Sequence, residues 1–387
     1  MHISNHSLKY AGDIMKTIPI YPSLLRQLGD PEESTFYFVT NSHLLDVFKI
    51  EPDTDYKDFK MLSYDPGDSF IKILKEQINE PAHILVITPD CLFESVHPDD
   101  LGQNRKLLIF ACNSAPTSIE AVEHFLRCGE KTDPEEQEKI SNQFFERGET
   151  ADILKLVDEE YGTVAEFNHL SDNYGWHEQL GMLGWGEQQI FPSGEIACFL
   201  VPLKGIDKLP ELQFELNGEI PLKGFPVVHS GPPSFLREDQ QRIYEKLSTF
   251  KDHAVIATIK DGIVVGMKAT HPSVQPALEI LEAMFMVDSR FRQIFEIGFA
   301  INPYIEILPQ NSAMNEVYGG EKGCVHFGFG MLPYTQYHLD LICPNIKVLG
   351  NNNELLLGGN WSGNYKNKQK PTRKIVPQRV AQCPCIG

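Results

Sequence analysis

Residues 106–111 read Lys-Leu-Leu-Ile-Phe-Ala, and residues 118–127 read Ser-Ile-Glu-Ala-Val-Glu-His-Phe-Leu-Arg. The first run is short, apolar and bounded by polar residues, which is typical of a buried parallel β-strand. The second run has apolar residues at helical spacing, and Thr117 or Ser118 is placed to cap its N-terminus. A strand followed by a helix is the repeating unit of a parallel α/β sheet, so this stretch decides the fold of the first part of the chain.

Two further strands are expected upstream, at residues 35–40 and 83–88, because both segments are short runs rich in β-branched, aromatic and other apolar residues. We therefore predict an α/β N-terminal domain with a parallel sheet, spanning residues 1–160. Residues 129–160 are crowded with Asp and Glu and predict an exposed helix and a connection to the next domain. No glycine motif for a nucleotide occurs in this domain, so no nucleotide is expected there.

From about residue 162 the sequence becomes rich in β-forming residues and glycine. Strands are expected within 186–195, 214–220 and 253–259, and Asp-Gly at 261–262 favours a tight hairpin turn. Residues 276–295 have the spacing of one long amphipathic helix. These features predict an α+β, mostly antiparallel domain over 161–362.

The last residues, 363–387, contain six basic side chains and no acidic one. Such a composition predicts a mobile tail on an acidic body. The eight cysteines are scattered, which favours free thiols over a disulfide framework. Only Cys383-Pro-Cys385 places two thiols close enough to share a soft metal ion.

Composition limits the classes of function. The 387 residues include 34 basic and 53 acidic side chains, a formal net charge of −19, which argues against nucleic-acid binding. The length is sufficient for two domains with separate cores. No apolar run approaches the length of a membrane span, and the N-terminal residues lack the apolar region of a secretory signal. We expect a cytoplasmic protein with no membrane or nucleic-acid partner.

Candidate metal ligands concentrate in four short segments of the second domain. His338 and Asp340 lie two residues apart, so on a strand both side chains project from the same face. Imidazole and carboxylate are usual ligands of Zn²⁺, Mn²⁺, Co²⁺ and Fe²⁺. The segments are Phe191-Pro-Ser-Gly-Glu195, Phe295-Glu-Ile-Gly-Phe-Ala-Ile-Asn-Pro303, Gly323-Cys-Val-His-Phe-Gly-Phe-Gly330 and Tyr337-His-Leu-Asp-Leu-Ile342.

The histidine of the third segment, His326, adds a second imidazole to His338 and Asp340. With Glu195 and Glu296 there are enough donors for two metal ions about 3.5–4 Å apart, an arrangement that activates water. Each residue also has a purely structural interpretation. A single histidine on an apolar strand is more often a hydrogen-bonded core residue than a metal ligand, and each glutamate is equally compatible with a surface carboxylate. By the same reasoning the isolated turn histidine at position 229 is expected to be structural.

The order of these segments resembles that of the thermophilic aminopeptidase family of metallopeptidases, which includes aminopeptidases T and S. The family has a P-x-G-E turn, an E-L-G-x-G-x-N-P segment after a long helix, a G-T-x-H-x-A-x-G strand and an H-x-D pair. The corresponding residues here are Pro192-Ser-Gly-Glu195, Glu296-Ile-Gly-Phe-Ala-Ile-Asn-Pro303, Gly323-Cys-Val-His-Phe-Gly-Phe-Gly330 and His338-Leu-Asp340. The resemblance covers about 165–360, whereas the N-terminal half agrees only in fold class.

The resemblance implies a metal-dependent aminopeptidase-like hydrolase that holds divalent metal, two ions of Zn, Co or Mn, through the five candidates. It also implies a catalytic tyrosine, for which Tyr334 is the nearest match and Tyr337 the substitute. A tyrosine hydroxyl would donate to the oxyanion formed when metal-activated water attacks a peptide carbonyl. Family members are commonly dimers, so a homodimer is expected. Only eleven residues separate His326 from His338, which is a shorter interval than in the family.

Two alternatives remain open. The same segments resemble 2,5-dihydroxypyridine dioxygenase, in which two histidines and an aspartate hold one Fe(II) ion; His326, His338 and Asp340 would then be the ligands. Glu195 and Glu296 would be supporting groups in that case. The other alternative is a non-catalytic aminopeptidase-like protein that binds a peptide for another enzyme, because fold alone does not determine function.

Overall fold

The computed structural model describes residues 17–91, 93, 95–171, 173–200, 213–230, 237–332 and 334–358. These residues form a five-stranded parallel sheet, a six-stranded and a seven-stranded antiparallel sheet, and a two-stranded pair. The arrangement agrees with a mixed fold that has an α/β part and an antiparallel α+β part. The predicted tail at 363–387, with Cys383 and Cys385, lies outside the described residues.

The parallel sheet contains the strands expected from the first part of the sequence. Its strand order is β10-β6-β5-β2-β4, and every neighbouring pair is parallel. The prediction at 35–40 matches β2, and the other two predicted strands begin one residue later than β5 and β6. The bounds are β2 Thr35–Thr40, β4 Asp58–Ser63, β5 Ala82–Ile87, β6 Arg105–Phe110 and β10 Gln188–Phe191; the separate pair is β1 Ile18–Ile20 and β3 Phe48–Ile50.

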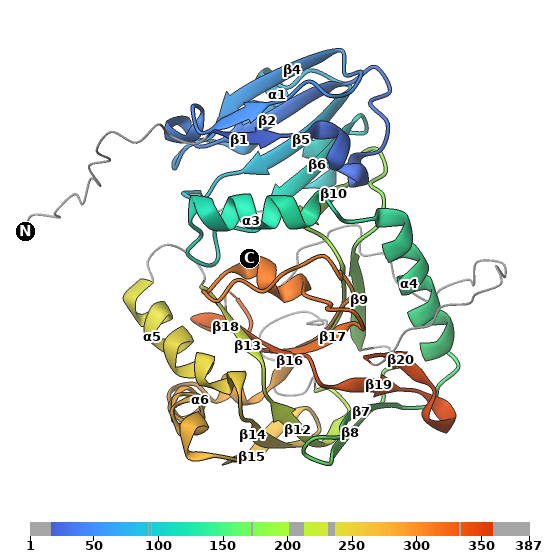
Figure 1. Ribbon diagram of the computed structural model, residues 1–387, viewed down its shortest axis with the longest axis vertical. Coiled ribbons are helices and arrows are strands. Elements are labelled where there is room, and N and C mark those ends of the chain that lie inside the picture. The colour runs from blue at the N-terminus through green and yellow to red at the C-terminus, as the bar shows by residue number, and fades with distance from the viewer. Residues whose placement is uncertain are drawn as a thin grey trace, which may run out of the picture.

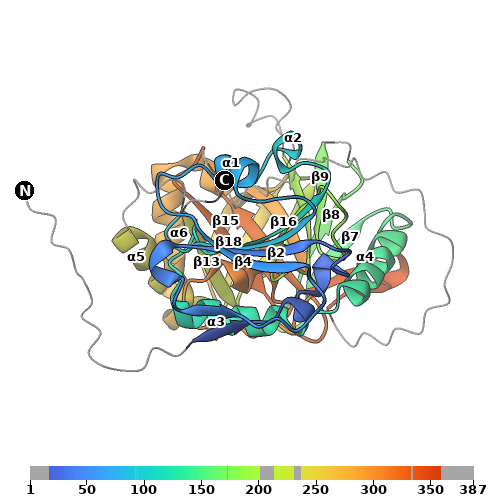
Figure 2. The same ribbon diagram turned by 90° about the horizontal axis from the view of Figure 1, so that it is seen from above.

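Helices cover both faces of this sheet, as Figure 2 shows for α1 (Phe70–Glu76) and α3 (Ile119–Gly129). The predicted cap of α3 is confirmed, because the Ser118 hydroxyl accepts a hydrogen bond from the Ala121 amide at 3.2 Å. In Figure 1, α3 lies between the parallel sheet and the antiparallel part. The short helix α2 spans Pro98–Leu101.

The six-stranded antiparallel sheet has the order β13-β18-β17-β16-β11-β9. Five of its strands are buried along their whole length or nearly so, which explains their apolar sequences. Its bounds are β9 Tyr174–Gln179, β11 Glu195–Leu200, β13 Phe225–Ser230, β16 Ile294–Ala300, β17 Cys324–Phe329 and β18 Tyr337–Cys343.

The seven-stranded sheet has the order β15-β14-β12-β8-β7-β19-β20. Its β14–β15 hairpin confirms the expected turn, since Asp261 (φ 49°) and Gly262 (φ 72°) both have the positive φ of a primed turn. The bounds are β7 Leu154–Asp158, β8 Thr163–Phe167, β12 Leu216–Leu222, β14 Val255–Lys260, β15 Ile263–Ala269, β19 Lys347–Leu349 and β20 Leu355–Leu357.

Three longer helices pack around the antiparallel sheets (Figure 1). The acidic segment forms α4, Pro134–Gly148, and Asp133 caps it. α5, Arg237–Leu247, and α6, Gln275–Val287, contact each other. The single helix expected at 276–295 is too long, because α6 ends at Val287 and the chain enters a 3₁₀-helix and then β16.

Short 3₁₀-helices connect the main elements, and one of them, η8, contributes to the site below. The large antiparallel core joins side chains from both sheets with α4, α5 and α6. The 3₁₀-helices are η1 Pro22–Leu24, η2 Arg26–Leu28, η3 Ser42–Leu44, η5 Ser248–Lys251, η6 Pro272–Val274, η7 Ser289–Arg292, η8 Ala313–Val317 and η9 Asn351–Asn353.

The two parts of the chain are interleaved in sequence. β10 joins the parallel sheet beside β6 although it follows β7, β8 and β9, which belong to the antiparallel sheets. The domain boundary at residue 160 stays a prediction. The six cysteines within the described ranges are free and buried, as expected.

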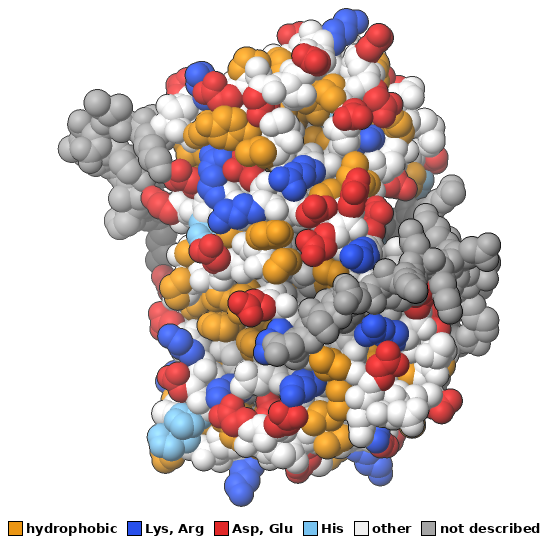
Figure 3. Space-filling model, turned by 45° about the vertical axis from the view of Figure 1, so that its right-hand side comes forward, with side chains coloured by type: hydrophobic (Ala, Val, Ile, Leu, Met, Phe, Trp, Pro, Cys, Tyr) orange, Lys and Arg blue, Asp and Glu red, His pale blue; other side chains and the backbone are white. Residues whose placement is uncertain are grey.

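The described part of the chain contains no helix long and apolar enough to cross a membrane. On the face in Figure 3, acidic and basic side chains are mixed with apolar ones rather than separated into patches of one sign.

Candidate metal centre

Strand pairing brings the five predicted ligands together on the six-stranded sheet. Glu195 begins β11, Glu296 lies in β16, His326 in β17, and His338 with Asp340 in β18. These four strands are consecutive neighbours in the sheet. The two-residue period of a strand places His338 and Asp340 on one face, as the sequence predicted.

The side-chain atoms of these residues approach one another closely. His326 Nε2 lies 3.0 Å from Glu195 Oε1 and 4.0 Å from Glu296 Oε1. His338 Nε2 lies 3.5 Å from Glu296 Oε2 and 3.0 Å from Asp340 Oδ1. All five side chains are at most 3 % exposed, so their charges are removed from solvent.

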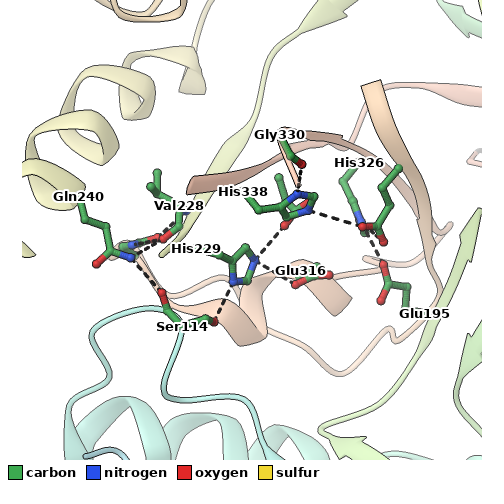
Figure 4. Close-up of polar contacts among 12 residues, drawn as sticks. Ser114, Glu195, Val228, His229, Gln240, Glu316, His326, Gly330 and His338 are labelled. Atoms are coloured by element: carbon green, nitrogen blue, oxygen red, sulfur yellow. Dashed lines mark hydrogen bonds and ion pairs between the residues drawn. The ribbon is translucent and has the colours of Figure 1, made fainter. Parts of the chain in front are cut away.

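Two residues that sequence reasoning did not assign to the site complete this cluster. His229, on β13, pairs in register with His338, and its Nε2 lies 2.8 Å from Asp340 Oδ2 and 3.3 Å from Glu316 Oε2. Glu316 lies in η8. The isolated turn histidine is therefore a buried strand residue facing carboxylates. The histidine–carboxylate cluster consists of Glu195, His229, Glu296, Glu316, His326, His338 and Asp340, and Figure 4 shows its arrangement.

The donor atoms form three groups, each containing one histidine. In each group the donor atoms lie within 4.8 Å of one another. Each pair of groups shares one carboxylate: Glu296, Glu316 or Asp340. We name them the His326 group (Glu195, Glu296, Glu316, His326), the His338 group (Glu296, His338, Asp340) and the His229 group (His229, Glu316, Asp340).

Most donor atoms of the cluster are too poorly aligned for hydrogen bonds. The Nε2 atoms of the three histidines, Glu195 Oε1 and both carboxylate oxygens of Glu296 and Asp340 are buried without a hydrogen-bond partner. These atoms lie close together but do not form hydrogen bonds with one another, and they face a shared space. Buried polar groups without partners are costly, and a cation held among these atoms could offset that cost.

Two glycines leave the space that these side chains occupy. Gly298 pairs with His326, and a Cβ atom at Gly298 would lie 2.0 Å from the His326 ring. A Cβ at Gly328 would lie 2.7 Å from both Glu296 Cβ and His338 Cε1. Both glycines belong to the segments that suggested the site, so they are required by the side chains packed beside them.

Hydrogen bonds from outside the cluster orient two of the histidines. His338 Nδ1 lies 2.6 Å from the Gly330 carbonyl oxygen, which can only accept, so Nδ1 carries the proton. His229 Nδ1 lies 2.8 Å from the Ser114 hydroxyl. In both rings Nε2 is left facing the carboxylates, which is the usual orientation of a metal-ligating histidine with an outer hydrogen bond.

The residue Ser114 connects the parallel sheet to the cluster. It follows β6, and its backbone oxygen accepts from the Ser230 amide at 2.8 Å and from Gln240 Nε2 at 3.0 Å. Gln240 Nε2 also donates to the Val228 carbonyl at 2.6 Å. The carboxyl end of a parallel strand thus contributes to the site, the edge where α/β sheets commonly hold ligands.

The electrostatics of the cluster favour positive charge among the carboxylates. Burial alone would lower the pKa of each histidine, but the facing carboxylates raise the pKa of His229 to about 9 and of His326 to about 10, and raise that of His338 as well. Burial, with the Glu316 charge, raises the pKa of Glu195 to about 8. Protons occupy such sites when no other cation does, and a divalent ion displaces them on binding.

The two candidate tyrosines differ in their contacts. The Tyr337 hydroxyl donates to Asp239 Oδ2 at 3.0 Å, away from the metal-ligand candidates. Tyr334 packs against the antiparallel core from the loop between β17 and β18. A catalytic role for either tyrosine stays a prediction.

Comparisons with known proteins add a fold relationship. No family model matches the sequence, and no curated protein is similar to it in sequence. Among solved structures, 2,5-dihydroxypyridine dioxygenase from Pseudomonas putida KT2440 matches with a TM-score of 0.50 and 11% identity, over 86% of this chain and 93% of that chain. Wild-type AmpT from Thermus thermophilus matches with a TM-score of 0.42 and 10% identity, over 84% of this chain and 93% of that chain. At such identities the dioxygenase match indicates a similar fold.

Proposed function

We propose that this protein is a divalent-metal-dependent hydrolase that acts on peptides through water activated between two metal ions. The observation that carries the proposal is the position of Glu296 between two histidines. Its Oε1 lies 4.0 Å from His326 Nε2 and its Oε2 lies 3.5 Å from His338 Nε2, so this carboxylate would help to hold an ion beside each histidine. Glu195 would complete the site beside His326, and Asp340 would complete the site beside His338.

The donor set suits borderline divalent ions such as Zn²⁺, Co²⁺ or Mn²⁺. Nitrogen and oxygen ligands of one tetrahedral Zn²⁺ ion at its usual distances stand about 3.3–3.5 Å apart. Three of the histidine–carboxylate separations in these two groups, 3.0, 3.5 and 3.0 Å, are close to that range, and the fourth, from His326 Nε2 to Glu296 Oε1, is longer at 4.0 Å. Two divalent ions supply charge that polarises a carbonyl group and lowers the pKa of water.

The chain's own residues would place and neutralise the reacting groups. Gly330 and Ser114 hold histidine rings in orientation, and the buried walls exclude bulk water. Tyr334 is our proposed donor to the oxyanion, because the Tyr337 hydroxyl is already bonded to Asp239. The choice of peptides as substrates rests on the resemblance of the four sequence segments to metallo-aminopeptidases.

The dioxygenase alternative draws support from the fold likeness reported above. It requires one Fe(II) ion held by His326, His338 and Asp340. Among the described residues, His326 belongs to the His326 group of donor atoms, whereas His338 and Asp340 belong together to the His338 group. This separation favours two metal positions over one, and we therefore prefer the hydrolase.

Activity measurements on the full chain test the proposal. Protein loaded with Zn²⁺, Mn²⁺ or Co²⁺ should release the N-terminal residue from short peptides, and Glu296→Gln should lower kcat/KM at least about 1,000-fold because the bridging carboxylate is lost. The matched control Glu282→Gln, an exposed residue of α6, should retain full activity.

Three other results would contradict the proposal. Undiminished cleavage by Glu296→Gln would place the active site elsewhere. Tight peptide binding without cleavage under all three metals would favour the non-catalytic binding protein. Oxygen consumption with dihydroxypyridine by the Fe(II)-loaded chain would favour the dioxygenase.

A further inference from the structure

We propose that His229, Glu316 and Asp340 form a third divalent-cation site, so that the loaded centre holds three ions rather than two. The inference rests on the proposed function for the other two positions, and it goes beyond the five-residue pattern that the sequence suggested. Zn²⁺ is the ion of choice, because one imidazole and two carboxylates provide the mixed nitrogen and oxygen donors that it prefers.

The first support is the position of Asp340. Its Oδ1 lies 3.0 Å from His338 Nε2, and its Oδ2 lies 2.8 Å from His229 Nε2. One oxygen therefore faces each histidine, as the two oxygens of Glu296 do for His326 and His338. If Glu296 bridges two ions on this geometry, Asp340 bridges a further pair for the same reason.

The second support is the unpartnered nitrogen of His229. The side chain is completely buried, and Nε2 has no hydrogen-bond partner although two carboxylates lie within 3.3 Å. Nδ1 is already engaged by the Ser114 hydroxyl, which fixes the ring with Nε2 aimed into the group. A structural histidine would direct Nε2 along a hydrogen bond, whereas a ligand directs it toward the ion.

The third support is the spacing of donors. His229 Nε2 stands 2.8 Å from Asp340 Oδ2 and 3.3 Å from Glu316 Oε2. Nitrogen and oxygen donors around one tetrahedral Zn²⁺ ion stand about 3.3–3.5 Å apart, so the second distance fits and the first widens by about half an ångström on binding. The histidine–carboxylate distances of the His229 group are thus no longer than those of the two groups assigned to the proposed hydrolase, which run from 3.0 to 4.0 Å.

Zinc binding by the full chain tests the third site. Chelator-treated protein is titrated with Zn²⁺ and the bound metal is counted by native mass spectrometry. A crystal of the loaded protein then gives an anomalous difference map at the zinc edge. We expect three ions per chain and three peaks within the histidine–carboxylate cluster. His229→Gln should bind two ions, and its map should lack only the peak beside position 229.

Control variants exclude other zinc sites. Cys383→Ser/Cys385→Ser removes the pair of thiols that the sequence identified as a possible soft-metal site. His271→Ala breaks the stacked pair with His253, whose ring centroids lie 4.1 Å apart. Both variants should keep the three ions of the cluster. Circular dichroism of His229→Gln verifies that the fold survives.

The outcomes separate this inference from the proposed function. Two ions in the wild type and two in His229→Gln would overturn the third site and leave the hydrolase intact. Three cluster ions without peptide cleavage would support the third site and contradict the hydrolase. The anomalous map decides even if His229→Gln fails to fold, because two peaks in the wild type already contradict the inference.

Discussion

Buried histidines occur in both the parallel sheet and the six-stranded sheet, and they have opposite electrostatics. His83 of β5 bonds to the Tyr56 hydroxyl at 2.7 Å, and burial together with Lys106 lowers its pKa to about 3. His326 of β17 faces Glu195 and Glu296, and despite burial its pKa is raised to about 10 by Glu195, with Asp340 and Glu316 contributing. Both side chains are completely buried, so burial alone does not identify a ligand.

The difference lies in the neighbours. His83 is a neutral core residue with a tyrosine, a tryptophan ring and a lysine nearby, an environment that rejects a cation. His326, in contrast, lies among carboxylates, whose negative charge attracts a cation. Buried carboxylates gathered around histidines, with nitrogen and oxygen atoms left without hydrogen bonds, distinguish the candidate metal centre from the packed histidine.

The largest expected effect is that of metal removal. Ions that bind only the folded state stabilise it by about 4 kcal/mol when their free concentration is 1,000 times Kd. Treatment with EDTA should therefore lower the Tm of this 387-residue chain by about 5 °C. Differential scanning calorimetry of the wild type and Glu296→Gln checks this, since EDTA should lower the Tm of the variant much less than that of the wild type. An equal loss in both proteins would mean that the stabilising ions bind elsewhere.

The next effect comes from the glycine beside His326. Gly298→Ala places a methyl group 2.0 Å from the ring and should cost about 3 kcal/mol of the free energy of unfolding, as well as metal affinity. Gly266→Ala in β15 is the matched control, because its Cβ would lie 3.9 Å from Thr258 and should change stability by less than about 0.5 kcal/mol. Urea unfolding measures both. Equal effects would show that the space beside His326 is not confined.

Acid should destabilise the parallel sheet through His83. Its folded-state pKa lies below the unfolded value of 6.5, so the unfolded chain binds more protons and stability falls as pH drops from about 6.5 toward 3. At pH 4.5 this single group costs about 2.7 kcal/mol. His83→Gln should therefore lose about that much less stability than the wild type between pH 7 and 4.5. Parallel losses in urea unfolding would show that His83 is protonated in the folded state.

The smallest expected effect concerns the cap of α3. Ser118→Ala should cost about 1 kcal/mol because the Ala121 amide loses its acceptor. Thr117→Ala should cost less, since the Thr117 hydroxyl bonds to the Ala115 carbonyl instead of capping the helix. Thermal unfolding of the two variants distinguishes the two cap candidates. A larger loss for Thr117→Ala would contradict the assignment.

Local signals explain which parts of the fold were predictable. The strand at 106–111 and the helix after Ser118 are specified by residues within one turn or one strand, so their positions agree closely with the structure. The helix at 276–295 was extended too far because apolar residues continue past its end. Phe291, in the 3₁₀-helix η7, and Ile294 and Phe295, in β16, are buried apolar residues that continue the pattern beyond Val287.

The site was only partly predictable because its residues meet through distant strand pairing. Glu195, Glu296, His326, His338 and Asp340 lie in recognisable segments, and the structure brings their side chains together. His229 joins them only when β13 pairs with β18, about 110 residues later in the chain. Glu316 lies in a five-residue 3₁₀-helix that has no periodic pattern, and no sequence signal marked it.

The most direct test of the metal centre is calorimetric titration of the chelator-treated full chain with Zn²⁺ in two buffers of different ionisation enthalpy. The cluster predicts tight binding with release of more than one proton per chain, because zinc displaces protons from histidines whose pKa values are raised. Glu296→Gln should bind fewer ions. No zinc binding at micromolar concentration, or binding unchanged by Glu296→Gln, would contradict a metal centre in the histidine–carboxylate cluster.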